Sequence, residues 1–123
     1  MKFQVTIVGH GAEALEFLND SDNSFFILFN ENAPEELAEI SVLHTISAVY
    51  KEPAPGDTIK IGDKEFKITA VGAEVPYTLR ELGHCTVNFG GGEEAALPGC
   101  IMLKGSEKVT VEDLQAGTEI SIY

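Results

Sequence analysis

Short runs of apolar and β-branched residues, separated by turn-forming residues, recur along the whole chain. Alternation of apolar and polar positions over four to eight residues predicts half-buried strands. We expect strands at residues 3–8, 25–29, 41–50, 58–61, 64–71, 84–89, 100–103 and 118–123. The pair Gly62-Asp63 between two alternating runs predicts a hairpin with a type I′ or II′ turn. Many short strands with a turn about every ten residues are typical of an all-β barrel or sandwich.

The predicted helical segments are all short. Pro34 to Leu37 has a proline at the first position and acids in the first turn, which favours a helix start. Tyr77 to Leu82 reads as a short helix that Gly83 ends. Residues 12–18 have helical propensity, but such a short run forms either one or two turns or a packed loop. A turn cluster follows at 21–24. The fold class we predict is a small barrel or barrel-like sandwich of about seven to nine short strands.

Length and charge narrow the functions. A chain of 123 residues forms a single domain, residues 1–123, with a sizeable core. Its 20 acidic and 8 basic residues give a net charge of −12, which disfavours binding of nucleic acid or anionic lipid. Such a surface attracts a basic protein partner in a salt-dependent way. The simpler alternative is an acidic surface that only aids solubility.

The chain carries no sign of export or membrane insertion. Cys85 and Cys100 lie in predicted strands beside apolar residues, where free cysteine is usually a small buried hydrophobe. Two such cysteines fit a reducing cytoplasm. The first residues lack a signal-peptide pattern, and no stretch approaches the ~18 apolar residues of a membrane span. We therefore expect a soluble, cytoplasmic protein.

Three histidines are candidates for chemistry. His10 lies between two glycines in a turn and is most simply an exposed residue. His84 begins a strand, where it either bonds a neighbouring carbonyl or has a catalytic role. His44 shares a predicted strand face with Val42 and Ile46, so we expect it to be buried among apolar side chains. Burial favours the neutral imidazole, which can act as a nucleophile or metal ligand. A satisfied core histidine is the alternative.

Other motifs give no site. The histidines are about forty residues apart and no pair of cysteines brackets them, so no metal motif is present, and we expect no metal and no cofactor. No serine lies in a nucleophile elbow. The glycines at 90–92 are followed by Glu93 and Glu94, whereas a phosphate-binding loop needs a lysine there. That loop is structural or mobile.

Several motifs together resemble one known family. They are AVG at 70–72, LRELGH at 79–84, T-V-x-F at 86–89 and PG at 98–99. The APEEL helix start at 33–37 and the PGD corner at 55–57 fall in the same order. The chain is similar over nearly its whole length to the glucitol/sorbitol-specific enzyme IIA components of the bacterial phosphoenolpyruvate-dependent sugar phosphotransferase system.

The resemblance implies a phosphotransferase component that works through a phosphohistidine. The phosphoryl group would come from the phosphocarrier HPr and pass to the enzyme IIB/IIC permease components of the membrane. The residue at the family's phosphorylated position is His44, with Nε2 as the expected nucleophile. Family members can carry a second histidine two residues later, where this chain has Ile46. His84 and Arg80 are therefore the candidates for supporting groups, although Arg80 can equally form a surface pair with Glu81 or Glu74.

A different class of function stays open at this point. The chain could be a non-catalytic acidic β-barrel that binds a partner, with an unreactive His44. It could also be phosphorylated on His44 and serve a regulator instead of a permease.

Overall fold

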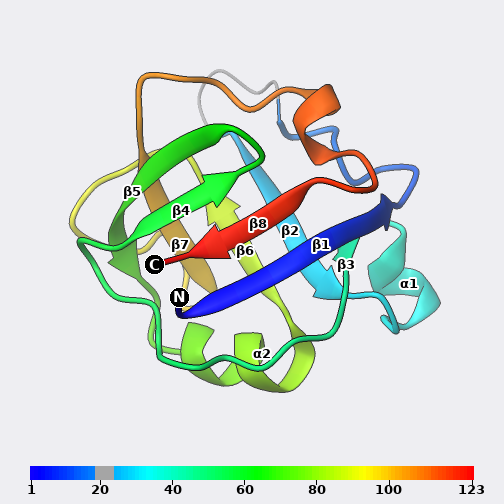
Figure 1. The fold of residues 1–123 in the computed structure, drawn as a ribbon, viewed down its shortest axis with the longest axis horizontal. Helices are drawn as coiled ribbons and strands as arrows, with labels where there is room; N and C mark the ends of the chain where they lie inside the picture. The colour runs from blue at the N-terminus through cyan, green and yellow to red at the C-terminus, as the bar shows by residue number, and fades with distance from the viewer. Residues whose placement is uncertain (19–23) are drawn as a thin grey trace.

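The computed structural model describes residues 1–18 and 24–123. Within these residues, eight strands close into a barrel in the order β1-β3-β2-β6-β7-β5-β4-β8 (Figure 1). The pairs β2–β3 and β6–β7 are parallel, and the other six pairs are antiparallel. The predicted all-β fold class is confirmed, with closure into a barrel. Closure leaves no exposed sheet edge.

The strands agree closely with the alternation in the sequence. Their bounds are β1 (Phe3–His10), β2 (Phe25–Asn30), β3 (Val42–His44), β4 (Thr58–Ile61), β5 (Lys64–Val71), β6 (Cys85–Asn88), β7 (Cys100–Lys104) and β8 (Glu119–Ile122). The predicted hairpin is confirmed, since Ile61 pairs with Lys64 across Gly62 and Asp63.

One strand is much shorter than predicted. The sequence favours a strand over 41–50, but β3 ends at His44. Thr45 still donates its N–H to Thr6 O, and Tyr50 donates to Lys2 O. Residues 46–49 form no backbone–backbone hydrogen bond with any described residue, so strand pairing with β1 is interrupted between these two hydrogen bonds. The expectation that Ile46 lies on a buried face is therefore wrong, because its side chain is 59% exposed.

The barrel interior is filled by inward-facing side chains of alternating positions. In β1, for example, Phe3, Val5 and Ile7 are buried while Gln4 faces outward. Both cysteines are free and buried, as predicted. Each fully buried large apolar side chain contributes about 1.5–3 kcal/mol relative to exposure.

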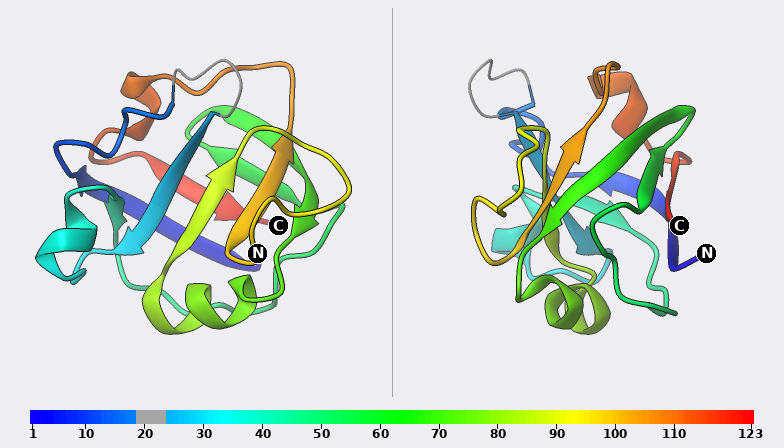
Figure 2. Two further views of the ribbon diagram at one scale, coloured as in Figure 1. Left: turned by 180° about the vertical axis from the view of Figure 1, so that it is seen from behind. Right: turned by 90° about the vertical axis from the view of Figure 1, so that its left-hand side faces the viewer.

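The helical segments lie outside the barrel wall. They are α1 (Glu35–Ala38), α2 (Val75–Leu82) and a 3-10 turn, η1 (Val111–Leu114). Helix α2 lies across one end of the barrel and buries Val75 and Leu79 there (Figures 1 and 2). Residues 12–18 form turns that bury Ala14 and Leu18, which matches the packed-loop alternative. The turn predicted at 21–24 lies outside the described residues except for Ser24.

Candidate functional site

His44 lies at the end of β3, between two neighbouring strands. It is opposite Ile7 of β1 and opposite Asn30 of β2 in the register. Its side chain is 0% exposed, and the edge of the Phe3 ring packs against it with centroids 6.0 Å apart. The predicted burial of this imidazole is confirmed.

Both ring nitrogens of His44 face backbone carbonyl oxygens. Nδ1 lies 2.8 Å from the oxygen of Thr45, and Nε2 lies 2.8 Å from the oxygen of Gly83. A neutral imidazole has a single N–H and can donate to only one of these oxygens. In the neutral ring the other nitrogen presents a lone pair to a carbonyl oxygen, which is a repulsive contact. The site therefore holds the ring on two sides, but in the neutral ring only one of the two nitrogens can form a hydrogen bond.

Gly83 reaches His44 because helix α2 ends there. Gly83 takes a left-handed backbone conformation, φ +63°, and donates to Leu79 O while the N–H of His84 donates to Thr78 O. This helix ending is a common one and favours glycine. A Cβ at Gly83 would overlap Oδ1 of Asn30 and lie 2.8 Å from Cε1 of His44. Position 83 therefore requires glycine for two reasons: the left-handed backbone conformation, and the lack of room for a Cβ beside Asn30 and His44.

Asn30 is a residue of this site that sequence reasoning missed. It is the last residue of β2, is 8% exposed, and its carboxamide reaches the same point beside Gly83 as the His44 ring. No hydrogen bond joins that carboxamide to another described residue. The only signal in the sequence was a polar residue that ends the apolar run FFILF. Its proximity to His44 depends on the parallel pairing of β2 with β3.

The two predicted supporting residues are Arg80, in the last turn of α2, and His84, just after the glycine that ends α2. Their surroundings differ. The Nδ1 of His84 lies 3.1 Å from the carbonyl oxygen of Leu28, and its ring packs on Phe29 with centroids 4.9 Å apart. Arg80 is exposed and pairs with Glu81 at 3.6 Å, the surface arrangement considered as its alternative. Neither side chain has a hydrogen bond to His44 in the structure, and their supporting roles stay predictions.

Other potentially reactive groups are unsuited to chemistry. His10 is exposed, as expected, but it is the last residue of β1, opposite Val42, and the turn predicted around it is wrong; its Nδ1 lies 3.1 Å from the oxygen of Gly11. Burial, with a smaller contribution from Cys100, raises the pKa of the Cys85 thiol to about 12, so the thiol stays protonated and is a poor nucleophile. In residues 1–18 and 24–123, no three histidine, cysteine or acidic side chains are grouped to bind a metal ion.

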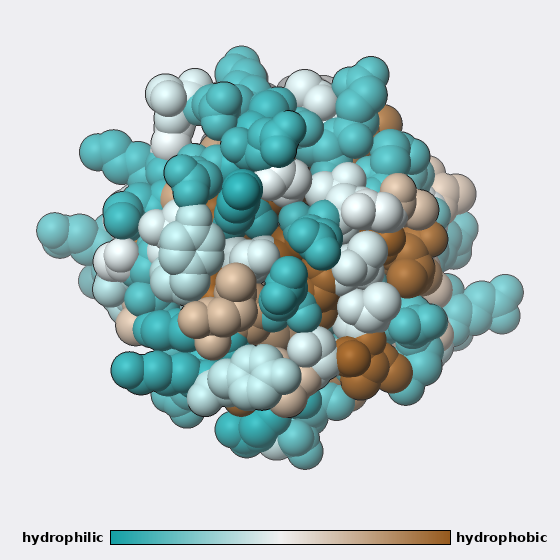
Figure 3. All heavy atoms as spheres, in the orientation of Figure 1, coloured by the Kyte–Doolittle hydropathy of each residue, from teal (hydrophilic) through white to brown (hydrophobic). Residues whose placement is uncertain are grey.

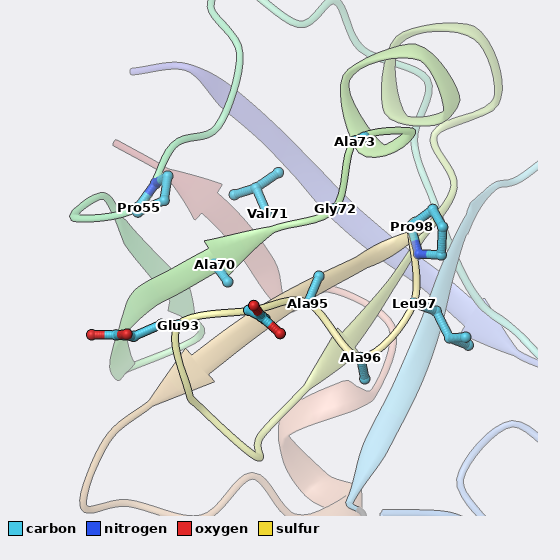
Figure 4. A pocket seen from close by; sticks show the side chains of 11 residues that line it. Pro55, Ala70, Val71, Gly72, Ala73, Glu93, Ala95, Ala96, Leu97 and Pro98 are labelled. Carbon is cyan, nitrogen blue, oxygen red and sulfur yellow. The ribbon is translucent and has the colours of Figure 1, made fainter.

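A hollow of about 450 Å³ opens between β5 and the loop before β7 (Figure 4). It is lined mainly by small apolar residues, among them Ala70, Ala95 and Pro98, together with the acidic Glu93 and Glu94. None of its lining side chains is a nitrogen or sulfur nucleophile. The hollow therefore offers no side chain that could form a phosphohistidine or a thiolate intermediate.

Comparison with known proteins defines the class of this chain. Residues 2–121 match the family of PTS system glucitol/sorbitol-specific IIA components. The glucitol/sorbitol-specific EIIA component of Escherichia coli (strain K12) is 36% identical over 103 residues, which span 84% of this chain and 81% of that protein. The corresponding component of Shigella flexneri matches to the same extent.

A solved structure extends the match to the fold. The crystal structure of a PTS system IIA component from Enterococcus faecalis V583 superposes with a TM-score of 0.72 at 26% identity, covering 97% of this chain and 98% of that one. These matches place the chain among the IIA components of the phosphotransferase system. Within that class it belongs to the glucitol/sorbitol-specific family. No described helix is long and apolar enough to cross a bilayer.

Proposed function

We propose that His44 accepts a phosphoryl group from phospho-HPr and passes it to the enzyme IIB/IIC permease components during glucitol/sorbitol uptake. The cytoplasm, where a soluble phosphocarrier works, is the proposed location. The observation that carries the proposal is the environment of His44 in a chain of this family. Of the three histidines, it is the one buried in the barrel wall with both ring nitrogens next to backbone carbonyl oxygens.

The geometry suits a histidine that carries a phosphoryl group. Phosphoryl transfer asks the protein for an in-line nucleophile and for stabilisation of the phosphoryl oxygens. When Nδ1–H of the neutral ring donates to the carbonyl of Thr45, Nε2 carries the lone pair that can attack phosphorus. This arrangement agrees with the expectation that Nε2 is the nucleophile.

The surface beside His44 suits a basic protein partner. Ile46 and Leu82 are exposed apolar residues next to the site in the sequence, and the acidic Glu31 and Glu81 are exposed beside them. The N–H of Glu31 donates to the carbonyl of His44, which fixes Glu31 next to the site. Apolar areas on the β1–β8 side of the molecule are small and separated by hydrophilic atoms (Figure 3). Exposed acidic residues close to His44 in this way would steer a donor with a basic face.

The test is direct phosphorylation of the purified protein. The chain is incubated with phosphoenolpyruvate, enzyme I and HPr and then weighed intact. We expect one added acid-labile phosphoryl group on the wild type and none on His44→Ala. The matched controls His10→Ala and His84→Ala should still be phosphorylated. Persistence of the added mass in His44→Ala would move the site to one of these two residues.

A non-catalytic binding module remains the second candidate, and one observation favours it. The His44 ring is wholly buried and its Nε2 is already in contact with Gly83. A histidine that never leaves this state is a structural residue of the core. Under that reading the wild type takes no phosphoryl group, while the loss of His44 lowers stability alone.

A further inference from the structure

We propose that Asn30 is the side chain that binds the phosphoryl group on His44, at a place that the Gly83 carbonyl occupies in the resting protein. This inference rests on the proposed phosphorylation of His44 and names a residue for which the family resemblance implied no role.

Nδ1 is the nitrogen that stays engaged. Its partner, the carbonyl of Thr45, belongs to a residue fixed to β1 by two hydrogen bonds. The N–H of Thr45 donates to Thr6 O at 2.9 Å, and its hydroxyl accepts from Thr6 N at 3.0 Å. Displacing this carbonyl would break the β1–β3 contact on both sides. The phosphoryl group is therefore assigned to Nε2.

Gly83 is the group that moves. The hydrogen bond of its own N–H is local to α2, and its carbonyl contacts His44 and no other described residue by hydrogen bond. The neutral imidazole required for attack donates through Nδ1, so Nε2 presents a lone pair to the Gly83 oxygen 2.8 Å away. The reactive form of His44 itself therefore weakens this contact, and because His44 is buried, no donor reaches Nε2 until the contact opens.

Asn30 is the polar side chain that this movement leaves beside His44. Its carboxamide approaches the position of the Gly83 peptide through Oδ1, and the register places it on the same face as the His44 ring, so rotation of the carboxamide brings its NH2 group to that place when Gly83 moves. A carboxamide offers two N–H donors and no charge. Preorganised donors of this kind stabilise the charge that develops on phosphoryl oxygens. Binding of the phosphoryl group would explain why the nearly buried carboxamide of Asn30 has no hydrogen-bond partner among the described residues.

The transfer step balances without a further reactant. The lone pair of His44 Nε2 forms the new P–N bond while the P–N bond of the donor phosphohistidine breaks and returns its electron pair to the donor ring. The proton on Nδ1 stays donated to Thr45 throughout. The two N–H groups of Asn30 donate to phosphoryl oxygens during and after transfer.

The experiment compares Asn30→Ala and Asn30→Asp with the wild type. Two quantities are measured: the rate of transfer from phospho-HPr and the half-life of the phosphorylated protein at neutral pH. We expect transfer to slow by about 100-fold or more in Asn30→Ala, the range in which loss of one preorganised donor acts. Asn30→Asp should be slower still, because a carboxylate repels the phosphoryl oxygens. A purely structural role would leave the half-life of the phosphorylated form unchanged.

Asn88 supplies the matched control. It is a buried asparagine at the other end of β6, opposite Phe25, and its Oδ1 accepts a hydrogen bond from Gly90 N. Asn88→Ala should lower stability and leave the transfer rate of the folded protein unchanged. Wild-type transfer rates and half-lives in both folded Asn30 variants would overturn the proposal.

A measurement on the wild type decides the matter if Asn30→Ala does not fold. In the 15N-labelled protein, phosphorylation should shift the side-chain NH2 signals of Asn30 and the Nε2 signal of His44. Unmoved Asn30 signals, or a phosphoryl group on Nδ1, would also overturn it. If the wild type accepts no phosphoryl group at all, the proposed function fails before this inference is reached.

Discussion

Two regions of the barrel differ in how completely their polar groups are paired. The pairing of β4 with β5 and with β8 is regular and antiparallel, with Ile61 opposite Ile120. Two ion pairs, Lys2–Asp57 and Lys64–Asp113, lie next to these strands. The corner of His44, Asn30 and Gly83 is different. There β3 ends at His44, and the carboxamide of Asn30 has no hydrogen-bond partner among the described residues. The carbonyl oxygen of Gly83, at the end of α2, contacts Nε2 of His44.

The regular region contributes mainly to the stability of the fold, whereas the His44 corner keeps polar groups that can take part in chemistry. In the regular region, the backbone of β4 is hydrogen-bonded to β5 on one side and to β8 on the other, and its isoleucines are buried. The His44 corner keeps hydrogen-bonding capacity in reserve, which costs stability but leaves groups available to a substrate. Substitutions in the two regions should therefore move different quantities.

The largest effect on stability is expected in the regular region. Ile61 is fully buried, so Ile61→Ala removes buried methyl groups and leaves a cavity. The free energy of unfolding should fall by about 2–5 kcal/mol, measured by urea denaturation. The exposed Ile46→Ala is the matched control and should change it by less than about 0.5 kcal/mol. Equal losses in the two variants would contradict the burial described here.

An intermediate effect is expected at the corner. Gly83→Ala should cost about 1–2 kcal/mol for the left-handed backbone, with a further cost for overlap with Asn30 and His44. Gly62→Ala is its control, because Gly62 has a similar φ of +60° but only an ordinary contact, 3.4 Å from the Thr118 methyl group. We expect the transfer rate to fall in Gly83→Ala alone. A similar fall in both variants would assign the effect to general instability.

The smallest effect is expected at an ion pair. Burial acts to raise the pKa of Asp113, but hydrogen bonds from Lys64 and Thr110 outweigh it and hold the pKa below its usual range. A carboxyl whose pKa is lower in the folded state stabilises the protein above its unfolded pKa, and this stabilisation is lost as the pH falls through the folded value.

Asp113→Asn should therefore cost about 1 kcal/mol at neutral pH, because the carboxylate loses its charge toward Lys64 and weakens its capping-box hydrogen bond from the Thr110 N–H at the start of η1. The difference from the wild type should shrink below about pH 4, near the ordinary pKa of aspartate. Thermal melts across pH 3–8 measure it. Asp63→Asn, at an exposed turn position, should show no such trend.

The sequence predicted the wall of the barrel well and the ends of its elements less well. Alternation is a local signal, so β4, β5 and the hairpin at Gly62 could be predicted directly from neighbouring residues. The run 41–50 alternates equally well, yet only three of its residues form a strand. Whether a strand continues depends on backbone pairing at each position, and residues 46–49 form no backbone hydrogen bond with β1.

The sequence by itself determined the all-β class, the family, and His44 as a buried imidazole, because these follow from local alternation and from contiguous motifs. Only the tertiary structure decided which groups surround that imidazole. Asn30, Thr45 and Gly83 come from the end of β2, the residue after β3 and the end of α2. Strand pairing and helix termination bring them together. No periodicity in a single chain encodes that meeting, since it depends on the register between strands distant in sequence.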